Sequence, residues 1–148
     1  PVHPAVGYRI RYKDRSLVLS GDTTLNDQVL TQSKGVDVLV HEALSPRLVR
    51  LLSEVAQQNG KPVVAKLMND VLDYHATPKE AAQTARDAQV GYLVLNHIVP
   101  TLPPLPGMEQ IFLGRARDIF NGPIKVGVDG DFISLPAASR TISVGSRL

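Results

Sequence analysis

The sequence contains no cysteine and no tryptophan, and aromatic residues make up only 5% of its 148 residues. The absence of cysteine excludes a disulfide framework, a cysteine-ligated zinc site and a thiol nucleophile. No apolar run approaches the roughly 18 residues that a membrane-spanning helix needs, so we expect no membrane partner. The beginning of the chain, Pro1-Val2-His3-Pro4, resembles neither a signal peptide nor a transit peptide.

A strong charge of one sign is also missing. Lysine and arginine exceed aspartate and glutamate by only two, so net charge favours no particular partner. The hydrophobic fraction of 43% is high enough to exclude a disordered chain. We therefore expect one soluble globular domain over residues 1–148, and we leave open whether its compartment is the cytoplasm or the periplasm.

Short apolar runs alternate with helical patterns in the first part of the chain. Residues Gly7–Tyr12 alternate with period two and predict a strand, and Ser16–Ser20 predicts a second strand that completes a hairpin. A short helix is expected near Leu25–Ser33, followed by a buried strand over Val36–Val40. The order strand, helix, strand is that of a βαβ unit.

The middle of the chain is predicted to be helical. One helix follows Ser45-Pro46 and a second follows Lys61-Pro62, because apolar residues recur there at helical spacing. Thr77-Pro78-Lys79-Glu80 has the pattern of a capping box and predicts the start of a third helix. Residues Tyr92–Leu95 then predict a buried strand, and Met108–Phe120 predict a helix.

The last part of the chain is expected to form a hairpin and a tail. The strands of this hairpin are Ile124–Val128 and Asp131–Leu135, and Asp129-Gly130 supplies the turn. Residues 137–148, after Pro136, are expected to form a loose tail. The whole pattern indicates an α/β (or α+β) protein with a mixed β-sheet.

The histidines are predicted to lie at the ends of elements. His41 and His97 follow apolar strands, His75 precedes the capped helix, and Asp22 follows a strand behind a glycine. Ligands gather beyond the carboxyl ends of strands in such sheets, and imidazole and carboxylate bind zinc-like ions. A single histidine in this position is more often a loop-packing or capping group, so the residues alone leave both interpretations open.

Five segments of the chain resemble, in order, the C-terminal half of a metallo-β-lactamase-fold hydrolase of the ribonuclease Z and arylsulfatase-like branch. The segments are Val2–Ile10, Ser20-Gly21-Asp22-Thr23, Val38–Ala43, Tyr74–Ala82 and Leu93–His97. The resemblance implies the second half of an αββα sandwich, in which a mixed sheet carries helices on one face.

The resemblance also implies roles for five residues. His3 would ligate one metal ion, His97 would ligate a second, and Asp22 would bridge both. The metals would be two zinc ions, with manganese or iron as alternatives, and a metal-bridging hydroxide would attack the substrate. Glu42 and His75 would form a catalytic pair that protonates the leaving group, or alternatively only a structural hydrogen bond.

One feature of the resembled family is absent from the sequence. The His-x-His-x-Asp-His segment of the first half of the fold does not occur, so only three of the seven expected ligands are present. We therefore expect the isolated chain to be inactive and to need the N-terminal half of the fold as a partner. We also expect a homo-oligomer.

Departures from the endonuclease pattern bear on the substrate. Leu44 and Ala76 stand where the endonucleases have threonine and serine, and the segment directly after His97, Ile98–Pro104, lacks the arginine of the tRNA-processing members. The sequence also lacks a basic run with which to hold a phosphate backbone. We therefore expect hydrolysis of a small sulfate or phosphate ester, with nucleic acid as a less favoured partner. The alternatives are a tRNA 3′-processing endonuclease and a non-catalytic binding or structural module.

Overall fold

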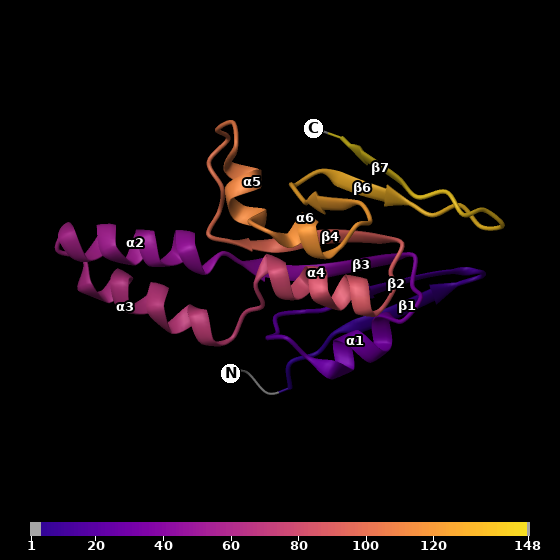
Figure 1. Ribbon diagram of the computed structural model, residues 1–148, viewed down its shortest axis with the longest axis horizontal. Helices are drawn as coiled ribbons and strands as arrows, with labels where there is room; N and C mark the ends of the chain where they lie inside the picture. The colour runs from indigo at the N-terminus through magenta and orange to yellow at the C-terminus, as the bar shows by residue number, and fades with distance from the viewer. Residues whose placement is uncertain (1–3, 148) are drawn as a thin grey trace.

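A five-stranded mixed sheet forms the centre of the computed structural model, which describes residues 4–147 (Figure 1). Its strands follow one another in space as they do in sequence, and the first two form an antiparallel hairpin while the others run parallel. The strands are β1 (Tyr8–Tyr12), β2 (Arg15–Leu19), β3 (Val38–Leu44), β4 (Tyr92–Val99) and β5 (Ile124–Val126). The predicted mixed sheet is thus confirmed.

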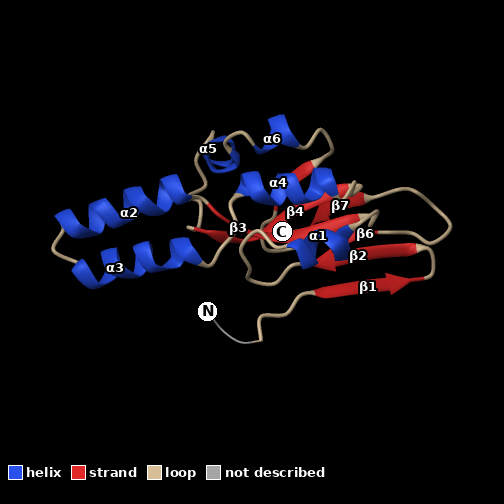
Figure 2. Ribbon diagram, turned by 60° about the horizontal axis from the view of Figure 1, so that its bottom comes forward, coloured by secondary structure: helices blue, strands red, loops and turns tan. Residues whose placement is uncertain are grey.

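Helices cover one face of this sheet, as predicted (Figure 2). Against them lies a core that contains Leu39, Leu93 and Leu95 of the central strands. The helices on this side are α1 (Asp27–Ser33), α4 (Pro78–Asp87), α5 (Met108–Leu113) and α6 (Ala116–Ile119). The capping box predicted at Thr77 is present, since its side chain accepts from the Glu80 amide and the Glu80 side chain accepts from the Thr77 amide.

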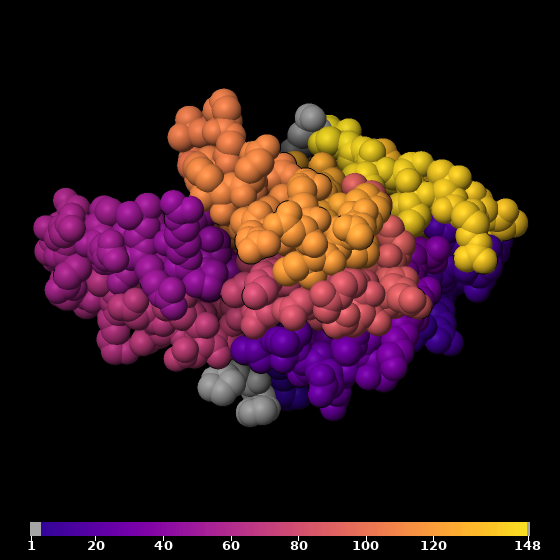
Figure 3. Space-filling model, in the orientation of Figure 1, coloured from indigo at the N-terminus to yellow at the C-terminus, as the bar shows by residue number. Residues whose placement is uncertain are grey.

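Two further helices, α2 (Pro46–Gln58) and α3 (Pro62–Asp70), form an antiparallel hairpin that projects beyond the end of β3 (Figure 3). A short 3₁₀ turn, η1 (Val71–Asp73), follows α3 and leads back to the sheet. Among the described residues, no helix is long and apolar enough to cross a membrane.

The sheet face opposite the helices is apolar and partly open. Strand register places Tyr8, Ile10 and Tyr12 of β1 on this face, and these side chains are 47–70% exposed. Val40 and Val94 lie farther along the same face, where they line a hollow together with Ile133 and Val144. The C-terminal strands therefore cover only the part of this face near β4 and β5.

The predicted C-terminal hairpin is wrong. Asp129-Gly130 does make a turn, but β5 joins β4 in the main sheet, whereas β6 (Asp131–Ser134) pairs with β7 (Ser143–Ser146). The expected loose tail therefore contains a strand. Arg15 anchors the segment that precedes β7. This buried side chain pairs with Asp37 at 3.1 Å and donates hydrogen bonds to the carbonyls of Ser139 and Thr141.

Other predicted boundaries also need correction. The single helix expected over Met108–Phe120 is divided into α5 and α6 at Gly114, which has a positive φ of 53°. β3 and β4 both run farther than the apolar runs that predicted them. As a consequence, His41 and His97 lie within strands and not beyond them.

Candidate metal centre and acid pair

Four predicted site residues meet at the carboxyl ends of the parallel strands. Asp22 follows β2, Glu42 lies in β3, and His97 lies in β4, while His75 precedes α4. The Nε2 atom of His97 lies 3.7 Å from Oδ2 of Asp22, and the Nδ1 atom of His75 lies 3.0 Å from Oε2 of Glu42. The rings of His75 and His97 are 5.4 Å apart, so the two pairs form one cluster.

Asp22 is positioned by a sharp turn at the end of β2. Gly21 has a φ of +64°, and a Cβ atom there would lie 2.3 Å from the carbonyl oxygen of Val6. Only glycine fits this turn without a shift of the backbone. Ser20 links the turn to the next strand, because its hydroxyl accepts a hydrogen bond from the amide of Glu42.

His97 occupies a β-bulge between β3 and β4. Glu42 pairs with Asn96 and Ala43 pairs with Ile98, so His97 is the extra residue and has no counterpart in β3. Its φ is +42°, an uncommon conformation for a residue other than glycine. Bulges of this kind redirect a side chain, and here the histidine faces Asp22. The apolar run Tyr92–Leu95 contains no signal for this bulge.

Glu42 is almost completely buried and makes two contacts with the segment that precedes α4. One carboxylate oxygen accepts a 2.6 Å hydrogen bond from the amide of Ala76, and the other contacts His75. Burial raises the pKa of Glu42 to about 7, against the opposing effect of the hydrogen bonds that it accepts. Burial also lowers the pKa of His75.

The electrostatics of this pair differ from the prediction. A carboxylate beside an imidazole ordinarily favours the protonated ring, as a general acid needs, but here burial disfavours both charges and outweighs that attraction. Burial therefore favours the uncharged forms of both groups, whose Nδ1 and Oε2 atoms are within hydrogen-bond distance.

His41, which sequence patterns grouped with the other histidines, does not face the cluster. It is buried within β3, and its Nδ1 lies 2.7 Å from the carbonyl oxygen of Glu42. Desolvation lowers its pKa, so the ring is neutral. Its role in this structure is to pack and to hold the backbone of β3.

Asp22 and His97 together suit a divalent metal, but they are an incomplete ligand set. Both side chains are more than half exposed, and they face each other at 3.7 Å. A carboxylate and an imidazole are ligands that zinc-like ions accept. No group of three potential ligands occurs in the part of the chain that the structure describes, and His3 lies outside those residues.

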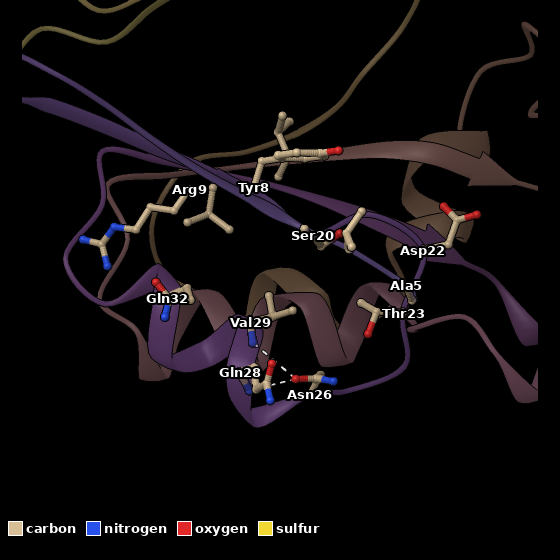
Figure 4. Close-up of a pocket in the computed structure, with 14 residues that line it drawn as sticks. Ala5, Tyr8, Arg9, Ser20, Asp22, Thr23, Asn26, Gln28, Val29 and Gln32 are labelled. Carbon is tan, nitrogen blue, oxygen red and sulfur yellow. Dashed lines mark hydrogen bonds between the residues drawn. The ribbon is translucent and has the colours of Figure 1, made fainter. Parts of the chain in front are cut away.

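A pocket adjoins this cluster that the sequence analysis did not foresee. It has a volume of about 330 Å³ and lies between α1 and the first two strands. Figure 4 shows Asp22 at one end of the pocket and Arg9 and Gln32 at the other. The pocket therefore leads from Asp22 along α1 to the guanidinium of Arg9.

Known proteins are similar to this chain in both sequence and fold. Residues 2–98 match the family described as the beta-lactamase superfamily domain. Proteins named ribonuclease Z from Mycobacterium bovis (strain BCG / Pasteur 1173P2) and from Mycobacterium tuberculosis (strain ATCC 25618 / H37Rv) are each 38% identical over 129 residues. These matches cover 87% of this chain but only 41% and 42% of the relatives, so the chain spans about two-fifths of their length.

The fold is similar to that of a solved structure. The metallo-beta-lactamase fold protein YhfI from Bacillus subtilis matches with a TM-score of 0.58 and 20% identity, over 97% of this chain and 46% of that protein. This structural similarity supports the arrangement of the sheet and the helices. It gives no information about the site residues. The chain therefore belongs to the metallo-β-lactamase superfamily, on the branch that includes ribonuclease Z.

Proposed function

We propose that this chain supplies part of the active site of a metal-dependent phosphodiesterase that cleaves RNA. The observation that carries the proposal is the cluster in which Asp22 faces His97 while Glu42 contacts His75. Relatives named ribonuclease Z support RNA as the substrate class. This substrate corresponds to the tRNA 3′-processing alternative, which we now prefer to a small ester.

Asp22 and His97 are the residues that would hold the metals. Asp22 would bridge two divalent ions, His97 would ligate one, and His3 would ligate the other, with zinc as the first choice. When bound, such a pair of ions lowers the pKa of a shared water and stabilises the attacking and leaving oxygens. The remaining ligands would come from the N-terminal half of the fold, which is the partner that we propose for this chain.

His75 and Glu42 would protonate the leaving oxygen. Glu42 is fixed by the Ala76 amide, and it holds His75 through Nδ1, so the orientation of the imidazole is set before substrate binds. General-acid assistance of this kind contributes roughly 10²–10⁴-fold to rate.

The two departures that favoured a small ester are internal to the protein. Leu44 and Ala76 are fully buried, and the Leu44 amide donates to the Ala76 carbonyl at 2.8 Å. Their side chains therefore do not contact a bound substrate, and they cannot discriminate RNA from a small ester. Two observations still favour a sulfate or phosphate monoester: the missing arginine in the segment after His97 and the absence of a basic run.

A comparison of substrates tests this proposal in the intact, metal-loaded protein. We expect cleavage of a tRNA precursor, and of an aryl phosphodiester as a small analogue, with both activities lost in Asp22→Ala. Turnover of aryl sulfates without RNA cleavage would instead support the small-ester function. No turnover of any of these substrates would favour a non-catalytic module.

A further inference from the structure

The pocket between α1 and the first two strands contains one charge of each sign, at opposite ends. Among its 14 lining residues, only Arg9 and Asp22 are charged, and Figure 4 shows them far apart along α1. This helix has seven residues and is therefore about 10 Å long. No ion pair among the described residues involves Arg9, so Asp22 does not neutralise it.

The register of the β1–β2 hairpin places Arg9 in this pocket. Arg9 pairs with Val18, a core residue, and therefore lies on the side of the hairpin that faces α1. The arginine side chain is half-buried, and its Nε atom is buried without an acceptor among residues 4–147. Buried donors in proteins are normally paired. The guanidinium thus has donor capacity that an acceptor on a ligand can satisfy.

The wall of the pocket beside Arg9 is polar and uncharged. Gln28 and Gln32 lie four residues apart, so they share one face of α1, and both line the pocket. Their amide groups can donate hydrogen bonds to an anion, but they do not cancel the charge of the arginine. Because Asp22 carries the only carboxylate in the lining, no acidic side chain competes with an anion for Arg9.

We propose that Arg9 binds a phosphate of the RNA strand other than the one that is cleaved at Asp22. This inference rests on the proposed function, because it requires RNA to be held at the metal centre. An arginine guanidinium matches a phosphate group through paired N–H donors. Arg9 would thereby set the position of the strand along α1, as phosphate contacts do in other nucleic-acid complexes.

The distance along the pocket favours a polynucleotide over a small ester. A single phosphate or sulfate group at Asp22 cannot also reach a guanidinium about 10 Å away. A nucleic-acid strand carries one phosphate for about every 3.4 Å of stacked length, so this distance corresponds to about three nucleotides. One fixed arginine at this spacing can hold the strand although the sequence has no basic run.

Two substrates test the proposal in the intact, metal-loaded protein. An aryl phosphodiester has one phosphate and should gain nothing from Arg9. Arg9→Ala should therefore lower the ratio of kcat/KM for RNA to kcat/KM for the aryl phosphodiester by about tenfold. Arg11→Ala is the matched control and should keep this ratio, because Arg11 lies two residues along the same strand but does not line the pocket. Equal losses on RNA in the two variants would indicate diffuse charge attraction and overturn the proposal.

The salt dependence of RNA binding is a second test, which no structural defect would imitate. With metal removed by a chelator, binding of a short single-stranded RNA can be measured apart from cleavage. Arg9→Ala should reduce the slope of log affinity against log salt concentration by about 0.7. Arg9→Lys keeps the charge and should keep the slope. An unchanged slope in Arg9→Ala would overturn the proposal.

Failure of the proposed function would give a different result from failure of this inference. If the wild type did not cleave RNA, or if Asp22→Ala still cleaved it, the proposed function would be wrong. If the wild type cleaved RNA but Arg9→Ala lost equally on RNA and on the aryl phosphodiester, only the role of Arg9 would be wrong. Thermal unfolding should show that Arg9→Ala keeps the fold, and Arg9→Lys provides the same comparison if it does not.

Discussion

His75 is the residue whose proposed role depends most on the substrate. If it protonates the leaving oxygen, His75→Ala should lower turnover of RNA or an alkyl phosphodiester by roughly 10²–10⁴-fold. A nitrophenyl ester should lose much less, because nitrophenolate leaves without a proton. Steady-state kinetics on both substrates, with metal content measured alongside, separates these effects. Equal losses on both substrates would assign His75 to structure or binding.

Glu42 should make stability depend on pH in a defined direction. Its pKa is about 7 in the folded protein and 4.5 in the unfolded chain, so only the unfolded state releases this proton between those values. The free energy of unfolding should therefore fall by about 3 kcal/mol, relative to that of Glu42→Gln, as pH rises from 4.5 to 7. Denaturant titrations of the two metal-free proteins measure this difference. Parallel pH profiles would show that Glu42 is already ionised in the fold.

At the residue scale, the sequence predicted which residues form the candidate site better than it predicted their pKa values and backbone conformation. Resemblance in the motifs around Asp22, Glu42, His75 and His97 named the residues that the fold brings together. The pKa directions of Glu42 and His75 could not be predicted, because they depend on burial by segments distant in sequence. The bulge at His97 depends on the register of two strands, which a local apolar pattern does not specify.

The turn between β2 and α1 is the element on which the metal site most depends. Gly21→Ala should cost at least about 2 kcal/mol of folding stability and weaken metal binding, because the new Cβ would clash with the Val6 carbonyl. Gly35→Ala is the matched control, since Gly35 has a similar φ of +67° but nothing within 4 Å of its Cβ position. The control should cost about 1 kcal/mol and keep the metal. Calorimetry measures the stability of both variants. Equal metal content in the two variants would contradict this role for the turn.

Elements with strong local signals were predicted well, and those decided by distant contacts were not. The capping box at Thr77 and the apolar run near Val38 specify their own structure. The turn at Asp129-Gly130 also forms, but β5 pairs with β4 and places Ile124 in the core, and it does not pair with β6. The strand β6 instead pairs with β7. A local turn signal cannot predict this pairing between distant segments.

At the scale of the whole molecule, the open sheet face and the incomplete ligand set both support our proposal that this chain pairs with the N-terminal half of the fold. Tyr8, Ile10 and Tyr12 remain exposed on an apolar face, while Asp22 and His97 are too few to hold a catalytic zinc ion. We expect the 148-residue chain alone to bind zinc weakly and to be inactive. Adding a polypeptide that carries the upstream half should restore metal binding and hydrolysis together, as calorimetry and a phosphodiester assay would show. Tight binding of two zinc ions by the chain alone would contradict this dependence.

We propose that Asp22 bridges two metal ions, and the metal content of the intact protein measures this role. Elemental analysis should find about two divalent ions per molecule in the wild type and almost none in Asp22→Ala, because one carboxylate serves both ions. Asp27→Ala, which removes an exposed carboxylate from the first turn of α1, should retain both ions. Unchanged metal content in Asp22→Ala would contradict the account and remove Asp22 from the metal centre.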